Sequence, residues 1–246
     1  MKIVHISHLY HPSEGGVQFF FKNVSERLVK DYGDDVTVVT TNSYYGPERK
    51  IFKKIEPSTE VINGVKVIRF PYRRWHLKLF SFIFKIFGKL SIKKPEWMIF
   101  QANGPYSKKM KSYLMKLQAD AIGASSSNYY YMQLPLWRRC NFFYYGSIHL
   151  NEDESRQVLY PSQLNSINAS TLYLANTGYE SRRLQQAGVN KDKLFVLGTG
   201  VDINDFIVAP GDVDAYRAHL GISANGILIG YVGRIERTKK SFIVSR

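Results

Sequence analysis

Two adjacent glycines, Gly15 and Gly16, separate a short apolar run from an amphipathic stretch in the segment HLYHPSEGGVQFF (8–20). If a helix begins here, its first free N–H groups and its dipole favour an anion at this end. Because glycine has no Cβ, the anion can come close to the backbone. The pair therefore indicates an anion site at a helix N-terminus, and a plain tight turn before the helix is the alternative.

Two cations near the C-terminus are further candidates for anion contact. Arg234 and Lys239 come just after the apolar run ILIGYVG, and doubly wound sheets bind ligands beyond the carboxyl ends of their strands. Arginine offers a planar fork for phosphate oxygens, and lysine offers a mobile point charge. The alternative for both is a solvated surface charge.

A metal site is not predicted. The acidic stretch NEDES (151–155) comes with no matching set of histidines or cysteines. An acidic helix start explains it equally well, because carboxylates are favourable near a helix N-terminus.

Strands and helices must position these candidate residues, and the sequence contains short apolar runs that alternate with helical patterns. The runs that we expect to form buried strands are KIVHIS, VTVVTT, VKVIRF, ADAIGAS, FFYYGSI, STLYLAN, KLFVLG and ILIGYVG. Between the first two, the apolar spacing predicts a helix ending at Gly33. TGYESRRLQQAG predicts another, with Thr177 as N-cap, Glu180 in a capping box and Gly188 at its end. The alternation predicts an α/β fold with a doubly wound, mostly parallel Rossmann-like sheet.

The domain organisation follows from the last part of the chain. We expect one domain over residues 1–205, and a linker and first strand of a second domain over residues 206–246. The polar connection APGDVDAYRAHLGISANG contains one short helix and precedes the run ILIGYVG. Only about twenty residues remain, too few for an independent core. The second domain is therefore expected to be truncated.

The composition and the N-terminal sequence indicate the cellular compartment of the protein. The 246 residues are 44% hydrophobic, and the single cysteine, Cys140, cannot form an intrachain disulfide. The apolar run within the N-terminal segment MKIVHISHLY is too short and too polar to be the apolar region of a secretory signal peptide. No stretch approaches the roughly 18 apolar residues that span a bilayer. We expect a cytoplasmic protein.

The net charge of +14 is concentrated in one part of the chain. The segment from Lys66 to Lys116 contains thirteen Lys or Arg residues and one acid, Glu96. Such a basic surface attracts nucleic acid, lipid headgroups or a charged substrate.

Within this basic segment, residues 75–94 predict an apolar helix with a narrow polar stripe. Lys78, Ser81, Lys85 and Lys89 form the stripe, and Phe80 and Phe84 belong to the wide apolar face. A short apolar helix ringed by cations is typical of an interfacial membrane anchor, so we expect an anionic membrane surface as a partner. A buried helix with its lysines at one edge is the alternative.

Three separated motifs together resemble the GT-B-fold glycosyltransferases of family 4, which retain the anomeric configuration. PSEGGVQ resembles their glycine loop, in a form similar to phosphatidylinositol mannosyltransferases. LYLANTGYESRRLQQAGVNKDKLFVLGTGVDINDF resembles the end of their first domain, and GYVGRIERTK resembles the strand opening their nucleotide-binding domain. The resemblance implies a hexosyltransferase-type enzyme. Its donor would be a nucleotide-diphosphate sugar, its acceptor lipid-linked or a polysaccharide, and it would need no cofactor.

The resemblance also implies roles for particular residues. Gly15, Gly16, Arg234 and Lys239 would hold the donor phosphates, and His149 would line the cleft near the transferring sugar as the catalytic candidate. His149 as a satisfied polar residue at a strand end is the alternative. His8, His11 and Gln18 would lie on the acceptor side, whereas His5 is expected in the core. The enzyme would be peripheral at the inner face of the membrane.

The sequence departs from this family at its C-terminal end. The family's second domain carries an acidic Glu-x7-Glu motif, and this chain ends before any such segment; Lys240 stands where the family has a glycine after the phosphate lysine. We therefore expect little or no transfer activity from these residues alone. Two alternatives stay open: a basic α/β module that binds nucleic acid through Lys66–Lys116, which no recognition motif supports, and a GT-B-type sugar-nucleotide epimerase.

Overall fold

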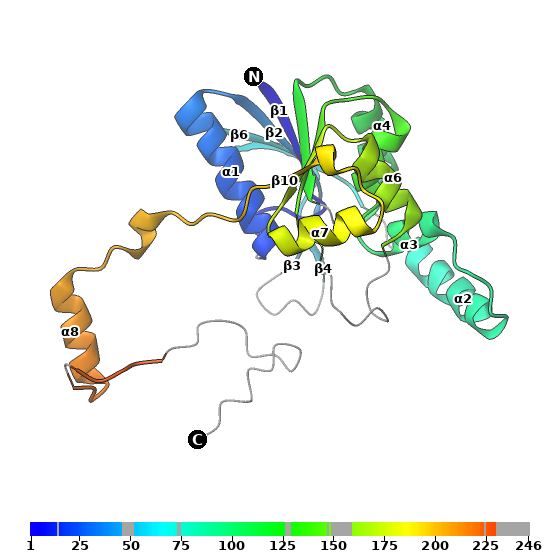
Figure 1. Cartoon of the computed structure of the whole chain (residues 1–246). Coiled ribbons are helices and arrows are strands. Elements are labelled where there is room, and N and C mark those ends of the chain that lie inside the picture. The colour runs from blue at the N-terminus through cyan, green and yellow to red at the C-terminus, as the bar shows by residue number, and fades with distance from the viewer. Residues whose placement is uncertain are drawn as a thin grey trace. The chain divides into compact units, whose positions relative to one another are not determined.

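The structure is a computed structural model that describes residues 1–13, 15–45, 52–72, 75–125, 129–146, 148, 159–223 and 225–229. The chain divides into two units, Met1–Thr199 and Gly200–Arg246. Figure 1 shows the first unit as a twisted sheet with helices on both faces.

The main sheet contains eight strands in the order β10-β9-β8-β7-β1-β2-β6-β5. Their bounds are β1 (Lys2–Ile6), β2 (Asp35–Thr41), β5 (Thr59–Ile62), β6 (Val65–Phe70), β7 (Ala121–Ser125), β8 (Phe142–Tyr145), β9 (Leu172–Ala175) and β10 (Leu194–Val196). All neighbours are parallel except β5, which pairs antiparallel with β6 at one edge. An antiparallel pair, β3 (Ser43–Tyr45) and β4 (Phe52–Lys54), forms a second, two-stranded sheet.

The strand order places a topological switch at the centre of the sheet. From β1 the chain first builds outward through β2 and β6, and later returns to the other side of β1 with β7. In open α/β sheets, ligands bind in the crevice at the carboxyl ends of the strands beside such a switch. The place to look for a site is therefore the carboxyl edge near β1 and β7.

Helices connect the strands and cover the sheet. In the first unit they are α1 (Gly16–Tyr32), α2 (Trp75–Lys89), α3 (Glu96–Ala102), α4 (Lys108–Lys116), α5 (Leu134–Trp137), α6 (Pro161–Ala169), α7 (Gly178–Gln186) and the 3-10 turns η1 (Tyr130–Gln133) and η2 (Lys191–Lys193). The C-terminal unit contains η3 (Ile203–Phe206) and α8 (Pro210–His219). No helix in the described ranges is both long and apolar enough to cross a bilayer.

Two apolar cores follow from the alternation of side chains along the strands. On one face, Val4 and Ile6 of β1 pack with residues of α4, η1 and α6, among them Met110, Tyr131 and Ile167. On the other face, the strand residues pack with Phe21 and other residues of α1; they are Ile3, Val36, Val38, Val65 and Val67. Because both faces are covered, the parallel strands are nearly continuous in apolar residues.

The sequence prediction of the fold class is confirmed. Seven of the eight predicted strands are β1, β2, β6, β7, β8, β9 and β10. The eighth, ILIGYVG, lies outside the described residues from Gly230 on, and its first three residues are not in a strand. Gly33 ends α1 in the left-handed conformation, with φ 68°, as predicted.

Strand β5 was not predicted. It forms a hairpin with β6 through Asn63 and Gly64, which adopt φ of 49° and 83°. Two successive residues with positive φ are typical of the tight turns that join hairpin strands.

Candidate functional site

Helix α1 begins at the glycine pair, directly after β1 and its loop. Gly15 is the N-cap residue and Gly16 is the first helical residue. The first intrahelical bond runs from the N–H of Phe19 to the carbonyl of Gly15, at 2.8 Å. No side chain among the described residues caps this helix end, and its first turn contains no acidic residue. The N–H groups of the first turn and the positive end of the dipole are therefore left for an anion.

Neither backbone strain nor packing requires glycine at this helix start. Gly15 has φ 169°, which is extended backbone that any residue adopts. A Cβ added to Gly16 would meet no atom within 4 Å. Gly16 therefore does not serve a crowded turn. Instead, it leaves open space in front of the first turn of α1.

A cavity of about 290 Å³ lies beside this helix end. Gly16, Val17 and Phe20 of α1 form one wall. The other lining residues come from the carboxyl ends of the neighbouring strands and from the α1 interior; they are Phe21, Ser125, Tyr145, Gly146, Asn176 and Thr199. The cavity thus lies at the edge of the sheet that the strand order indicates.

A polar network fixes the strand ends that line this cavity. Asn176 donates through its side-chain amide to the carbonyl of Gly146, and its Oδ1 accepts from the hydroxyl of Thr199 at 3.1 Å. Beneath them, the buried carboxylate of Glu180 accepts from the N–H of Asn176 at 2.8 Å and the N–H of Ile148 at 3.1 Å. It also accepts from the hydroxyl of Tyr173 at 2.6 Å.

The role predicted for Glu180 is only half correct. Thr177 is the N-cap of α7, and its hydroxyl accepts from the N–H of Glu180 as predicted. The Glu180 carboxylate, however, does not close a capping box on Thr177. Three donors from strands β8 and β9 and their ends surround it instead, so its function is to hold these strand ends together.

Aromatic side chains form the wall between the cavity and the core. Phe20, Phe21 and Tyr145 pack edge to face, with ring centroids 5.0 to 5.6 Å apart. His5 lies behind them in β1, and its Nδ1 is 2.7 Å from the hydroxyl oxygen of Ser25. Gly123 allows this close packing, because an added Cβ would lie 2.8 Å from the Tyr145 ring and 2.9 Å from the His5 ring.

The histidines near the site differ in environment. His5 is buried, as predicted, and burial lowers its pKa to about 4. His8 is also buried, and its ring stacks on Tyr129 with centroids 3.7 Å apart. Burial lowers the pKa of His8 to about 3, so both rings are neutral at neutral pH. His11 is exposed on the loop before α1, and Gln18 is half-buried in the first turn.

The predicted site residues other than Gly16 are not among the described residues that line this cavity. His11 and Gln18 are close to it in sequence but are not among its lining residues. His149, Arg234, Lys239 and the stretch NEDES lie outside the described residues. In the part of the chain that the structure describes, no three His, Cys, Asp or Glu side chains gather as metal ligands would.

The basic apolar helix is α2, which packs on α3 and extends away from the sheet (Figure 1). Phe80 is only 8% exposed and packs edge to face on Trp97 of α3, so its placement on an outward apolar face was wrong. Phe84 is half-buried beside it, with the ammonium of Lys94 5.1 Å from its ring centre. Trp97 itself remains 53% exposed.

A different set of apolar side chains on α2 is exposed. Leu79, Phe82 and Ile86 of α2 and Leu90, the residue after its end, are exposed at spacings of three and four residues, so they form one stripe along this side. Lys85 and Lys89 are exposed next to this stripe. Lys78 belongs to α2, but its side chain lies outside the described part.

Sequence reasoning missed most of the cavity. Tyr145, Gly146 and Asn176 come from predicted strands, yet no motif marked them as site residues. The available signal was their position, because each stands at the carboxyl end of a predicted parallel strand.

The comparisons with known proteins bear on the fold of the chain. No protein-family model matches the chain. The D-inositol 3-phosphate glycosyltransferase of Nocardia farcinica (strain IFM 10152) is 34% identical over 74 residues, which are 30% of this chain and 16% of that protein. Anabaena HepE in complex with UDP-glucose is similar in structure, with a TM-score of 0.53 and 17% identity, over 98% of this chain and 55% of that one. HepE in complex with UDP is similar with a TM-score of 0.50 and 16% identity, and the match covers 90% of this chain and 50% of that one.

These similarities define the class of fold. The chain has the α/β architecture of GT-B glycosyltransferases, with a mostly parallel eight-stranded sheet flanked by helices. It spans about half the length of these solved structures and about a sixth of the curated relative. The finer resemblance, to family 4 and to phosphatidylinositol mannosyltransferases, stays a prediction.

Proposed function

We propose that this chain is part of a retaining glycosyltransferase that moves a hexose from a nucleotide-diphosphate sugar to a lipid-linked or polysaccharide acceptor. One observation carries the proposal. The N-terminus of α1, which no side chain of the described residues caps, opens at Gly15 and Gly16 beside a cavity at the carboxyl edge of the sheet. The fold supports the same class, and the HepE structures contain UDP or UDP-glucose.

The chemistry that this helix end suits is stabilisation of a leaving diphosphate. When the bond between sugar and diphosphate breaks, negative charge grows on the phosphate oxygens. Oriented N–H groups and a helix dipole stabilise that charge without reorganising during the reaction. In this proposal the distal phosphate lies against Gly15 and Gly16. Arg234 and Lys239 hold the diphosphate, and His149 lies near the transferred sugar.

The acceptor side of the proposal rests on α2. Its exposed stripe of Leu79, Phe82, Ile86 and Leu90, beside Lys85 and Lys89, has the character of a helix that lies in a membrane interface. Each basic residue near an anionic bilayer contributes on the order of 1 kcal/mol. A protein held there peripherally would meet a lipid-linked acceptor at the surface where that acceptor resides.

A panel of nucleotide sugars tests the proposed function. The full-length enzyme that contains this chain is incubated with UDP-glucose, other UDP-hexoses and GDP-mannose, together with a lipid extract or polysaccharide acceptor, and products are identified by mass spectrometry. The proposal predicts a product heavier than the acceptor by one hexose, with release of the nucleoside diphosphate. Conversion of the nucleotide sugar to its epimer without an acceptor would favour the epimerase alternative. Tight, salt-sensitive binding of RNA without any nucleotide-sugar binding would contradict the proposal.

A further inference from the structure

A charged side chain occupies a core-facing position of strand β6. Side chains alternate between the two faces of a strand, and in β6 the buried series runs Val65, Val67, Arg69. The Arg69 side chain is only 1% exposed. A valine would continue the pattern, so the arginine at this position needs a reason other than apolar packing.

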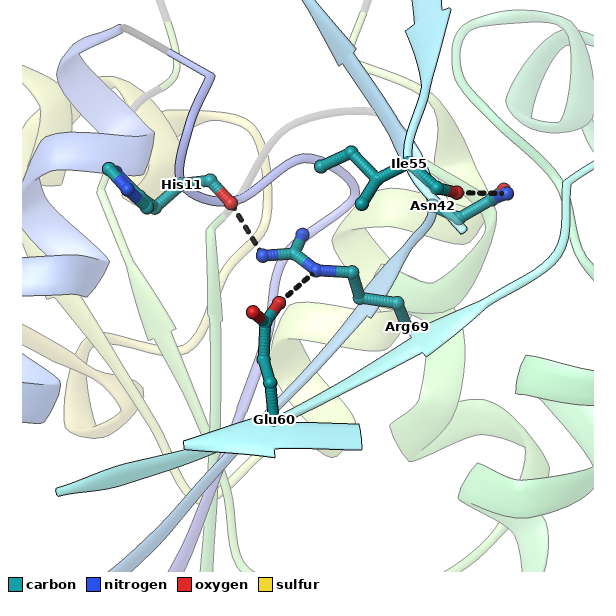
Figure 2. Close-up of polar contacts among 5 residues, drawn as sticks. All are labelled: His11, Asn42, Ile55, Glu60 and Arg69. Atoms are coloured by element: carbon teal, nitrogen blue, oxygen red, sulfur yellow. Dashed lines mark hydrogen bonds and ion pairs between the residues drawn. The ribbon is translucent and has the colours of Figure 1, made fainter. Parts of the chain in front are cut away.

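The guanidinium of Arg69 bridges an edge strand and the loop that leads to the glycine pair. Figure 2 shows its Nε donating to the Glu60 carboxylate of β5 and its Nη2 donating to the carbonyl of His11. The distances are 2.5 Å and 2.6 Å. The third nitrogen, Nη1, is buried without a hydrogen-bond partner among the described residues.

Hydrogen bonds tie the loop between β1 and α1 to neighbouring strands. The N–H of Ser7 donates to the carbonyl of Val39 in β2 at 3.1 Å, and the hydroxyl of Thr41 at the end of β2 donates to the carbonyl of His8 at 2.8 Å. Further along the loop, Arg69 binds the carbonyl of His11, four residues before Gly15. Within the loop, the N–H of Ser13 donates to the carbonyl of Tyr10 at 2.9 Å. The bond from Arg69 is the charged one of these attachments.

Stability alone does not account for this arginine. Burying a cation has a desolvation cost, and well-packed apolar residues often replace buried ion pairs without loss of stability. Glu60, the acidic partner, is 41% exposed in its side chain, so solvent screens the ion pair. What an apolar residue cannot replace is the directed hydrogen bond to the His11 carbonyl.

We propose that Arg69 is a positioning residue: by holding the His11 carbonyl, it fixes the loop over residues 7–13 and therefore the place of the first turn of α1. The guanidinium fork suits this task because it binds the Glu60 carboxylate and the loop carbonyl from one planar group. The consequence for ligand binding rests on the proposed function, in which that first turn receives the donor diphosphate. When the first turn is already held in place, phosphate binding does not have to order the loop. The entropic cost of binding is therefore smaller.

Hydrogen exchange and UDP titration of the whole chain test this inference. The variants are Arg69→Leu, Arg69→Lys and Glu60→Gln, with Lys66→Leu as the matched control because Lys66 is exposed on the same strand. In Arg69→Leu, amides in a peptide over residues 8–19 should exchange about tenfold faster, which is the loss of one charge-assisted hydrogen bond. UDP affinity should fall by about the same factor. Arg69→Lys should lie between, and Glu60→Gln and Lys66→Leu should exchange like the wild type in this peptide.

The outcomes separate the inference from the proposed function. Faster exchange confined to residues 8–19, with weaker UDP binding, supports the positioning role. A lower melting temperature with unchanged exchange in that peptide overturns it. Faster exchange with unchanged UDP affinity supports the positioning of the loop and contradicts the proposed donor site at the first turn of α1. If Arg69→Leu does not fold, wild-type exchange in Arg69→Lys overturns the positioning role. If the wild type does not bind UDP at all, the proposed function fails, while the exchange data still decide whether Arg69 holds the loop.

Discussion

Two buried histidines beside the site should make the protein sensitive to mild acid. His5 is surrounded by Phe21, Tyr145 and Ser25, and His8 stacks on Tyr129. Burial lowers their pKa values to about 4 and about 3, whereas an unfolded histidine titrates near 6.5. Because the unfolded chain binds these protons first, acid favours unfolding. The stability is present above the unfolded pKa and is lost as pH falls below it.

The size of the effect follows from the difference in pKa values. One pKa unit corresponds to about 1.4 kcal/mol. Between pH 8 and pH 5, each histidine should lower the free energy of unfolding by about 2 kcal/mol, so the pair contributes about 4 kcal/mol. Since small proteins are stable by about 5–15 kcal/mol, this loss is a large fraction of the total.

Urea denaturation followed by circular dichroism at pH 8, 7, 6 and 5 measures this loss. His8→Phe should reduce it by about half, because phenylalanine can stack on Tyr129 but cannot be protonated. His219→Gln is the control, since it also removes one histidine but from an exposed position on α8. A wild-type stability that is constant from pH 8 to pH 5 would refute the assignment of two buried neutral histidines, as would an unaltered loss in His8→Phe.

Three further predictions concern other parts of the chain. Glu180→Ala should lower the free energy of unfolding by about 3–5 kcal/mol in urea denaturation, because three donors lose their acceptor; a loss below about 1 kcal/mol would contradict the network. Gly64→Ala should cost about 1–3 kcal/mol, since φ is +83° and the new Cβ would lie 2.8 Å from Val29, whereas Gly88→Ala in open space on α2 should be neutral or stabilising. The double variant Phe82→Ser/Ile86→Ser should no longer co-sediment with anionic vesicles, while its melting temperature should not fall. A wild-type protein that stays in the supernatant with these vesicles at low salt would contradict membrane contact.

Local patterns in the sequence predicted local structure well. The apolar spacing of α1 and Gly33 at its end were sufficient to place that helix, because amphipathic periodicity and left-handed glycine termini act within a few residues. The N-cap role of Thr177 was confirmed for the same reason. The hairpin of β5 and β6 was missed although Asn63 and Gly64 carry the signal in the sequence itself.

Contacts between distant segments were not predictable in the same way. The pattern of α2 separates a polar from an apolar face, but it does not say which apolar positions α3 will cover, and so Phe80 was placed wrongly. The spacing of Thr177 and Glu180 indicates a capping box. The Glu180 carboxylate instead accepts hydrogen bonds from three donors in and after β8 and β9. Arg69 was counted only as one charge of a basic surface, because nothing in its own segment reveals the loop carbonyl that it binds.

The central claim is that the glycine start of α1 receives the diphosphate of the donor, and a titration of Gly16→Val with UDP tests it most directly. An added Cβ at this position would meet no protein atom within 4 Å, so the variant should keep its stability while its branched side chain fills the space in front of the first turn. Isothermal titration should show UDP binding by the wild type and an affinity at least about tenfold lower for the variant, the loss of one charge-assisted contact. Equal affinity of the two proteins for UDP, at equal melting temperature, would contradict the claim.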